Sequence, residues 1–289
     1  MRATTLAMAA GLGLSLFFTA CRPDEPIPRK PTQPPVGQTP GSDPGNGSGN
    51  EQPPAQTPGQ QPPAGNPDQN PPAVPGNKLS QMGTKRFAYD AQGRLSKLEY
   101  TDQNHHGYDV VYEGDKAVRL NFKAGGYLLY AYEGDRVKEA ARYYGDNQVN
   151  YRYQFRYEGD KLVKESQISY ARSDKGQLTV YQYSYDAQGN LTRIAVAGTE
   201  GTDEATLSAP TYITYGDYDT HENPAPFAES HIYLPGVTLF RNNPGYRESS
   251  GYRQLFTYSY GENKLPKERY EKLSTHPHLA AFVISYQYQ

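Results

Sequence analysis

A short tyrosine motif that runs into a tight turn recurs along the C-terminal two thirds of this chain. Its fullest form, Tyr-Asp-Ala-Gln-Gly-x-Leu, lies within residues 87–95 and again within 183–191. Shorter or more divergent copies occupy 112–116, 132–136, 157–161 and 258–265. The first five anchoring tyrosines are 20 to 28 residues apart in the sequence. That period fits one β-hairpin and its connection, so the repeat predicts a chain built from successive hairpins.

The residues of each copy support this prediction. Asp-Ala-Gln-Gly suits a type I turn closed by a left-handed glycine, and Gly-Asp suits the positive-φ positions of a two-residue turn. Before the turns, aromatic residues alternate with polar ones, as in Tyr-Arg-Tyr-Gln-Phe-Arg-Tyr at 151–157. A period of two indicates half-buried antiparallel strands. We therefore predict an all-β antiparallel meander of about 14 to 16 short strands, curled into an open or flattened barrel-like sheet. Its tyrosines would face inward, with Arg, Lys, Gln and Thr outside.

The rest of the chain divides by composition. Residues 22–77 contain 17 of the 24 prolines and no aromatic residue, whereas all 27 tyrosines lie between Tyr89 and Tyr288. A segment without apolar periodicity cannot bury enough surface to offset its ordering entropy. We predict a signal peptide at 1–20, a lipidated cysteine with a disordered tether at 21–78, and the tyrosine-rich β-repeat domain at 79–289.

The first 21 residues have the organisation of a secretory signal. Arg2 precedes an apolar run that is too short for a spanning helix, and the run ends at Phe18-Thr19-Ala20-Cys21. This ending resembles the lipobox of bacterial lipoproteins, although that pattern prefers Leu, Val or Ile where Phe18 stands. Cys21 is the chain's single cysteine, so it has no internal disulfide partner. The alternative is an ordinary signal peptide with a leftover thiol.

An acidic pair, Asp24-Glu25, follows the cysteine closely. It resembles the export signal that sends some lipoproteins to the outer face of the outer membrane. We therefore expect an outer-membrane lipoprotein, held through the lipid on Cys21 and facing the cell exterior. A periplasm-facing position is the alternative, because a solvated charge pair has the same sequence.

Two family resemblances rest on the repeat. Tyr-Asp-x-x-Gly-Arg-Leu at 89–95 is similar to the YD repeat of Rhs-type and teneurin-type shells. The overall layout, with lipobox, tether, hairpins and the segment 215–224, resembles an uncharacterised family of bacterial lipoproteins, a domain of unknown function with a porin-like fold. This second resemblance covers roughly residues 80–289. It implies a curled sheet or flattened barrel and no established activity.

A porin-like fold need not form a membrane pore. Membrane strands need about 9 to 11 residues and a lipid-facing aliphatic row. Here we expect shorter strands, an apolar row made mainly of tyrosine, and an anchor supplied by lipid. The side chains of so many strands could not fill the lumen of a closed barrel, so we expect an open or flattened curl.

The charge and motif content narrow the functional classes. The formal charge is −2, which lacks the basic footprint that nucleic acid requires. The sequence has no nucleophile elbow, no metalloprotease His-Glu-x-x-His and no second cysteine. We expect no enzyme activity and no cofactor. Asp217, Asp219 and Glu222 are weak candidates for a calcium site, for which turn chemistry is the better explanation because the glycine of a calcium loop is missing.

The longest departure from the repeat is the segment 198–251, which contains five prolines. Long irregular insertions on a rigid β scaffold commonly carry recognition. Its aromatic residues are our candidate ligand contacts: Tyr215, Tyr218, Phe227, Tyr233, Phe240, Tyr246 and Tyr252. We expect a binding or adhesion module for a glycan or protein ligand; the alternative is a structural envelope protein that assembles with outer-membrane partners. The tyrosine row is either packed core or an open groove.

Overall fold

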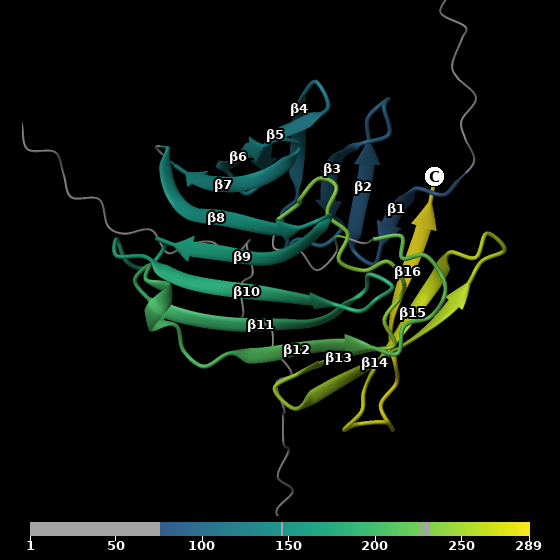
Figure 1. Ribbon diagram of the computed structural model, residues 1–289. Coiled ribbons are helices and arrows are strands. Elements are labelled where there is room, and N and C mark those ends of the chain that lie inside the picture. The colour runs from purple at the N-terminus through teal and green to yellow at the C-terminus, as the bar shows by residue number, and fades with distance from the viewer. Residues whose placement is uncertain (1–75, 146, 226, 228–231) are drawn as a thin grey trace, which may run out of the picture. The chain divides into compact units, whose positions relative to one another are not determined.

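The computed structural model describes residues 76–145, 147–225, 227 and 232–289. These residues form sixteen β-strands and one short 3-10 helix, Glu204–Thr206 (Figure 1). The strands are β1 Leu79–Met82, β2 Lys85–Tyr89, β3 Leu95–Tyr100, β4 Tyr108–Glu113, β5 Lys116–Phe122, β6 Tyr127–Glu133, β7 Arg136–Tyr144, β8 Gln148–Glu158, β9 Lys161–Ser169, β10 Gln177–Tyr185, β11 Leu191–Glu200, β12 Thr211–Gly216, β13 Tyr246–Ser249, β14 Tyr252–Tyr260, β15 Pro266–Leu273 and β16 Phe282–Tyr288.

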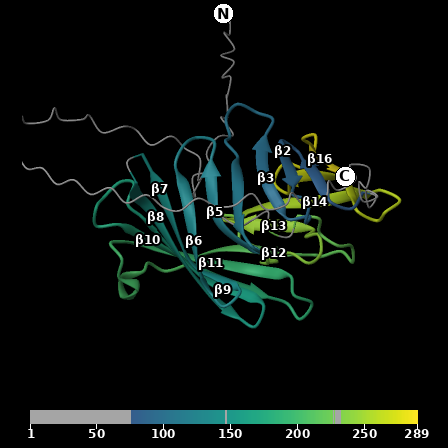
Figure 2. The same cartoon turned by 90° about the horizontal axis from the view of Figure 1, so that it is seen from above.

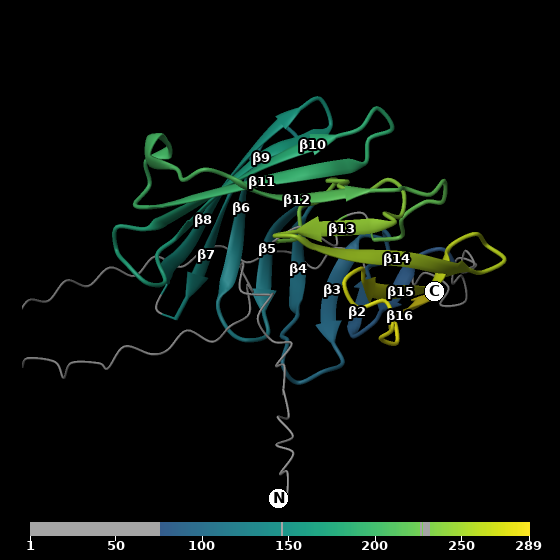
Figure 3. The ribbon, with the colours of Figure 1, turned by 90° about the horizontal axis from the view of Figure 1, so that it is seen from below.

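The strands form one closed antiparallel barrel. Each strand pairs with its neighbour in the sequence, and β1 pairs with β16 to close the ring. The all-β meander predicted from the repeat is confirmed. Figures 2 and 3 show that β9 to β12 cross over the opposite wall formed by β3 to β6, which gives the barrel a flattened section.

The expectation of uniformly short strands is wrong for part of the wall. Strands β7 to β11 and strand β14 contain 9 to 11 residues each. These strands are long because neighbouring strands of similar length pair with one another along most of their residues. Strand length alone therefore does not separate this barrel from a membrane barrel.

The longer turn form has the predicted geometry. Gly93 takes a φ of 79°, and its N–H donates to the Asp90 carbonyl at 2.9 Å. The Asp90 carboxylate also accepts the backbone N–H groups of Gln92 and Arg94, at 3.0 and 2.9 Å. The shorter form differs from our prediction, because only its glycine has positive φ. In the β4–β5 turn Gly114 has a φ of 57° and Asp115 does not enter that region, as in a type II′ hairpin.

Each repeat tyrosine lies at a β-bulge. The pairing register shifts immediately before Tyr89, Tyr112, Tyr132, Tyr157 and Tyr185. A bulge bends its strand and increases the local twist. One bulge per hairpin therefore supplies the curvature that lets sixteen strands close into a ring.

The repeat tyrosines also join neighbouring hairpins. Four of the five hydroxyls donate to a backbone carbonyl at or near the start of a strand in the preceding hairpin, on the end of the barrel that we call the tyrosine rim. The bonds run from Tyr89 to Leu79, from Tyr112 to Leu95, from Tyr132 to Ala117 and from Tyr185 to Leu162, all at 2.8 to 2.9 Å. The tyrosine of the repeat thus satisfies a carbonyl outside its own hairpin.

The basic residue that follows the repeat turn has a matching role. The Arg94 guanidinium lies 3.9 Å from the ring centroid of Tyr112, and the Lys116 ammonium lies 5.2 Å from that of Tyr132. The same two cations donate to the turn carbonyls of Gly114 and Gly134, both at 2.6 Å. The repeat therefore encodes contacts between hairpins as well as the turn inside each hairpin.

The two faces of β8 have opposite chemistry, as predicted, but the expectation that Arg and Gln lie outside is wrong in places: Arg142 pairs with the inward Leu128 and Gln167 pairs with the inward Tyr153, and both are buried. On β8, Tyr153 and Phe155 are buried inside, while the intervening Arg152, Gln154 and Arg156 are exposed. The interior also holds one buried carboxylate, Glu165 on β9, which accepts a hydrogen bond from the Tyr183 hydroxyl at 2.9 Å. Among the described residues no helix is long and apolar enough to cross a membrane. The signal peptide at 1–20, Cys21, Asp24-Glu25 and the tether up to residue 75 lie outside the described residues.

Candidate functional site

The main irregular segment of the barrel connects β12 to β13. We call residues 217–245 the insertion. Its two arms run antiparallel near the tyrosine rim: Asp219 donates its N–H to the Asn243 carbonyl at 3.1 Å, and Asn223 donates to the Arg241 carbonyl at 3.0 Å. An isolated bridge joins Glu222 to Asn242 between these contacts.

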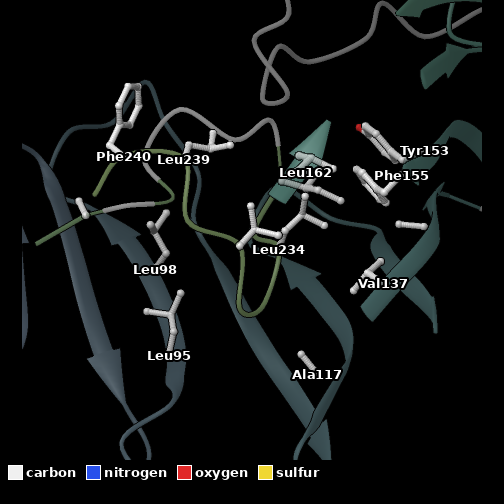
Figure 4. Packing of buried hydrophobic residues seen from close by; sticks show 14 of the residues in the cluster. Leu95, Leu98, Ala117, Val137, Tyr153, Phe155, Leu162, Leu234, Leu239 and Phe240 are labelled. Carbon is white, nitrogen blue, oxygen red and sulfur yellow. The ribbon is translucent and has the colours of Figure 1, made fainter. Parts of the chain in front are cut away.

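The apolar side of the insertion packs inside the barrel. Six of its described residues are buried and belong to the main core: Ala225, Ile232, Leu234, Val237, Leu239 and Phe240. Figure 4 shows Leu234 and Leu239 between the wall that carries Leu95 and Leu98 and the wall that carries Leu162. A flattened sixteen-strand barrel leaves more internal volume than its own side chains fill. The insertion occupies that volume as an internal plug.

Polar contacts also tie the insertion to the barrel wall. The Tyr130 hydroxyl of β6 donates to the Tyr233 carbonyl, a contact between residues 103 positions apart. The Phe87 ring of β2 meets Phe227 edge-on at 6.0 Å between centroids, and Phe227 meets Tyr233 in the same way at 5.7 Å. The insertion therefore extends from β12 and β13 across the interior to β2 and β6.

Asn190 holds the insertion where it leaves the interior. Its side-chain oxygen accepts the backbone N–H groups of Arg241 and Asn242 at 3.0 and 2.8 Å, and its amide nitrogen donates to the Asn242 side chain at 3.2 Å. Asn190 occupies the repeat position at which the first copy has Arg94. A basic residue there would reach toward the next hairpin, so this copy has exchanged a contact between hairpins for one with the insertion.

We predict that Asn190→Ala lowers the free energy of unfolding by about 1–3 kcal/mol, because two backbone donors lose their acceptor. Urea unfolding followed by circular dichroism measures this change. Asn104→Ala is the matched control; Asn104 is exposed in the β3–β4 loop and its change should stay within about 0.5 kcal/mol. Equal stability of the two variants would contradict the role assigned to Asn190.

Two of the three candidate calcium ligands make contacts within the scaffold, and the third, Glu222, lines the cavity described below. The Asp219 carboxylate accepts the N–H groups of His221 and Asn243, at 3.0 and 3.1 Å, and the Tyr260 hydroxyl. Burial, followed by the negative Asp219 beside it, raises the pKa of Tyr260. Asp217 forms an ion pair with Arg253 at 3.3 Å. Across the described residues no three His, Cys, Asp or Glu side chains gather as a metal site would require.

Five of the candidate aromatic contacts lie in two internal groups. Tyr215 and Phe240 are buried and meet edge-on at 5.0 Å, and Tyr218 donates its hydroxyl to the Leu191 carbonyl. Phe227 and Tyr233 form the second group, against the β2 wall. Packing accounts for their positions, and a ligand contact by any of them stays a prediction.

The remaining two aromatic candidates lie on the surface. Tyr246 covers Gly216, where an added Cβ would come within 2.7 Å of its ring, and the Arg253 guanidinium lies 3.8 Å from its centroid. Tyr252, at the β13–β14 turn, is 43% exposed.

The insertion also forms a cavity that the sequence analysis did not identify. It has a volume of about 480 Å³ and is lined by Thr220, Glu222, Asn223, Thr238, Phe240, Arg241 and Asn242. Small-molecule sites commonly have volumes of about 300–1,000 Å³. A second cavity, beside Tyr215 and Phe256, measures about 20 Å³ and has room for little more than a water molecule.

Of the cavity's lining, we had selected only Glu222 and Phe240 from the sequence. The signal that was available is the polar pair Arg241-Asn242 directly after the apolar pair Leu239-Phe240. That change of character marks where the chain passes from the barrel interior to the rim. These residues line a cavity only because the opposite arm of the insertion pairs with them, and that pairing cannot be read from the sequence.

Comparisons with known proteins bear on the fold. No family model and no curated protein matches the chain. Among solved structures, a porin-like protein from Bacteroides vulgatus is similar, with 15% identity and a TM-score of 0.51 over 73% of this chain and 98% of that one. A porin-like protein from Bacteroides uniformis has 13% identity and a TM-score of 0.49, over 74% of this chain and 97% of that one. The fold of the β domain is therefore that of a porin-like barrel, as the resemblance in the sequence implied.

Proposed function

We propose that this protein is a membrane-tethered binding module, with a plugged and rigid barrel that presents a ligand site at the insertion. The observation that carries the proposal is the cavity of about 480 Å³ on the insertion. A pocket of that size with convergent polar groups is the default place for a ligand. In this proposal the protein acts by binding, without catalysis and without a cofactor.

The barrel is proposed to lie outside the bilayer. A lipid-facing wall needs an apolar outer band, because a charged residue at bilayer depth costs about 2–4 kcal/mol. The outer face of β8 instead carries Arg152, Gln154 and Arg156, and the outer face of β9 carries Lys164, which pairs with Glu204 at 2.6 Å. Because the insertion occupies the interior, we do not propose that the barrel conducts solutes through its lumen.

The anchor in this proposal is the lipid on Cys21, with Asp24-Glu25 directing the protein to the outer face of the outer membrane. Both features lie in the sequence that precedes the described residues. Metabolic labelling with a clickable fatty acid tests the anchor, since Cys21→Ser should abolish the label. Protease treatment of intact cells distinguishes the exterior from the periplasmic face.

A glycan and protein array probed with the purified chain, carrying Cys21→Ser to keep it free of lipid, tests the binding function. We expect saturable binding to a defined subset of ligands. Heat-denatured protein is the control for dependence on the fold. Uniform background across both arrays would overturn the proposal.

A second candidate is a structural role in the envelope. The observation that favours it is the exposed apolar group at the β15–β16 hairpin, where Leu279, Phe282 and Val283 are 50%, 66% and 46% exposed. Exposed apolar groups of this kind are common at protein contacts. Crosslinking in intact cells should then recover a stable outer-membrane partner that is lost in Phe282→Ser. Recovery of the protein alone would count against this role.

A further inference from the structure

The side chains that line the insertion cavity divide into two sets. One set is already used by the scaffold. Asn223 accepts the N–H of Ala225 at 2.8 Å, and the Asn242 amide donates to the His221 carbonyl at 3.0 Å. The Phe240 ring is buried against Tyr215. These three residues hold the walls and the floor of the cavity in place.

The other set has polar groups that the scaffold does not use and that are available to a guest. Within the described part of the chain, the side chains of Thr220, Glu222 and Thr238 make no hydrogen bond or ion pair, and all three residues are exposed. Arg241 makes one long contact, from its guanidinium to the Gln188 carbonyl at 3.4 Å. The cavity thus presents one carboxylate, one guanidinium and two hydroxyls to whatever enters it.

The two charges stay apart although they lie on paired arms. Within the described residues Glu222 and Arg241 form no ion pair. The backbone explains this separation. Glu222 lies opposite Asn242 in the bridge, while Arg241 is bonded to the neighbouring Asn223. Both residues nevertheless line the same cavity, so a guest in it would meet a charged acceptor and a charged donor.

This arrangement selects for the chemistry of the guest. An anion would be attracted by Arg241 but repelled by Glu222. A cation would be attracted by Glu222 but repelled by Arg241. A neutral molecule with adjacent hydroxyl groups satisfies both, because each hydroxyl donates one hydrogen bond and accepts others. Hydrogen bonds to charged groups are the stronger ones. Phe240, buried against Tyr215, closes the floor of the cavity from the side of the core.

The walls are also fixed before a guest arrives. Asn190 holds the Arg241–Asn242 arm through two backbone bonds, and Asp219 holds Asn243 and His221 on either side of the pairing. A site that is already ordered loses less conformational entropy when it binds. The cavity is therefore preorganised even though its polar groups come from an irregular segment.

Resting on the binding function proposed above, we propose that the insertion cavity binds a neutral sugar. In this site Glu222 accepts and Arg241 donates hydrogen bonds to neighbouring hydroxyls, with Thr220 and Thr238 at the sides and Phe240 beneath. Glu222 and Arg241 are the two residues that determine specificity.

Saturation-transfer NMR with the full chain carrying Cys21→Ser tests the site. The probes are glucose, galactose, mannose and N-acetylglucosamine, with acetate, choline and glycine as an anion, a cation and a zwitterion. We expect saturable transfer to at least one sugar and none to the three charged probes. Affinity should fall about tenfold or more in Glu222→Gln and in Arg241→Ala. The exposed residues Glu200 and Arg172 provide matched controls, as Glu200→Gln and Arg172→Ala, and these should bind as the parent does.

The outcomes separate this inference from the binding function itself. If an array ligand binds but Glu222→Gln and Arg241→Ala leave its affinity unchanged, the protein is a binding module and the cavity assignment is overturned. If glycine competes with the sugar, or binds in its place, the neutral class is wrong. If neither the array nor the sugars bind, both proposals fail. Circular dichroism of each variant excludes unfolding as the cause of a loss.

Discussion

Replacing Leu239 by alanine is expected to lower the free energy of unfolding by about 2–5 kcal/mol. Leu239 is 0% exposed and belongs to the core shared by the insertion and the barrel walls. Its carbonyl accepts the N–H of Leu191 at 3.0 Å, a bond that alanine retains. The expected loss is therefore that of buried side-chain contacts and the cavity left behind. Urea unfolding followed by circular dichroism measures it.

Leu279→Ala is the matched control, because Leu279 is 50% exposed in the β15–β16 connection. Its change should stay within about 0.5 kcal/mol. If Leu239→Ala unfolds at the same urea concentration as Leu279→Ala, the insertion does not support the barrel from within. A large effect instead means that the barrel and its plug are one cooperative structure.

The second large effect is expected at alkaline pH, where the protein should unfold cooperatively. Burial, the largest cause in each case, raises the pKa of Tyr89, Tyr132 and Tyr157 to about 12. Burial also raises the pKa of Tyr130 and Tyr183 well above 10. The unfolded chain ionises its tyrosines near pH 10, while the folded chain keeps these protons. The stability they contribute is complete below pH 10 and is lost as the pH rises toward the folded values.

Each fully buried tyrosine that ionises only on unfolding removes about 1.4 kcal/mol per pH unit in that window, and the half-exposed rim tyrosines remove less. Domains of this kind are stable by only about 5–15 kcal/mol, so several such groups exceed the margin. The buried tyrosines should therefore ionise together in one step, seen as a steep rise in tyrosinate absorbance that coincides with the loss of circular dichroism. Complete ionisation of the tyrosines with the β-sheet signal intact would contradict this expectation.

The strands and turns were predictable because their signals are local. The period of two in 151–157 and the Asp-Ala-Gln-Gly turns require only neighbouring residues, and both appear in β8 and in the β2–β3 turn. The assignment of positive φ to Asp115 failed because the type II′ form needs only its glycine there. The length of β7 to β11 was underestimated because their extension depends on pairing with each other.

The candidate site was predictable only in part. The predicted irregular segment, 198–251, contains the end of β11 and all of β12 and β13, so only its middle part, the insertion, is irregular as predicted. Aromatic residues were the obvious feature of its composition. These residues take their positions because the insertion fills the internal volume of the barrel. No pattern within the segment itself reveals that volume. Asn190 could have been noticed as the copy of the repeat without a basic residue, yet its partners Arg241 and Asn242 lie 51 and 52 positions away.

By itself the sequence determined the all-β class, the hairpin repeat and the inward side of the tyrosines, because these depend on φ preferences and side-chain alternation over a few residues. The tertiary structure alone decided that β1 meets β16, that the insertion turns inward, and that Glu222 and Arg241 face one cavity. These features depend on contacts between residues far apart in the chain. Such contacts form where buried volume must be filled and backbone groups must find partners, and those demands arise only when the whole sheet has closed.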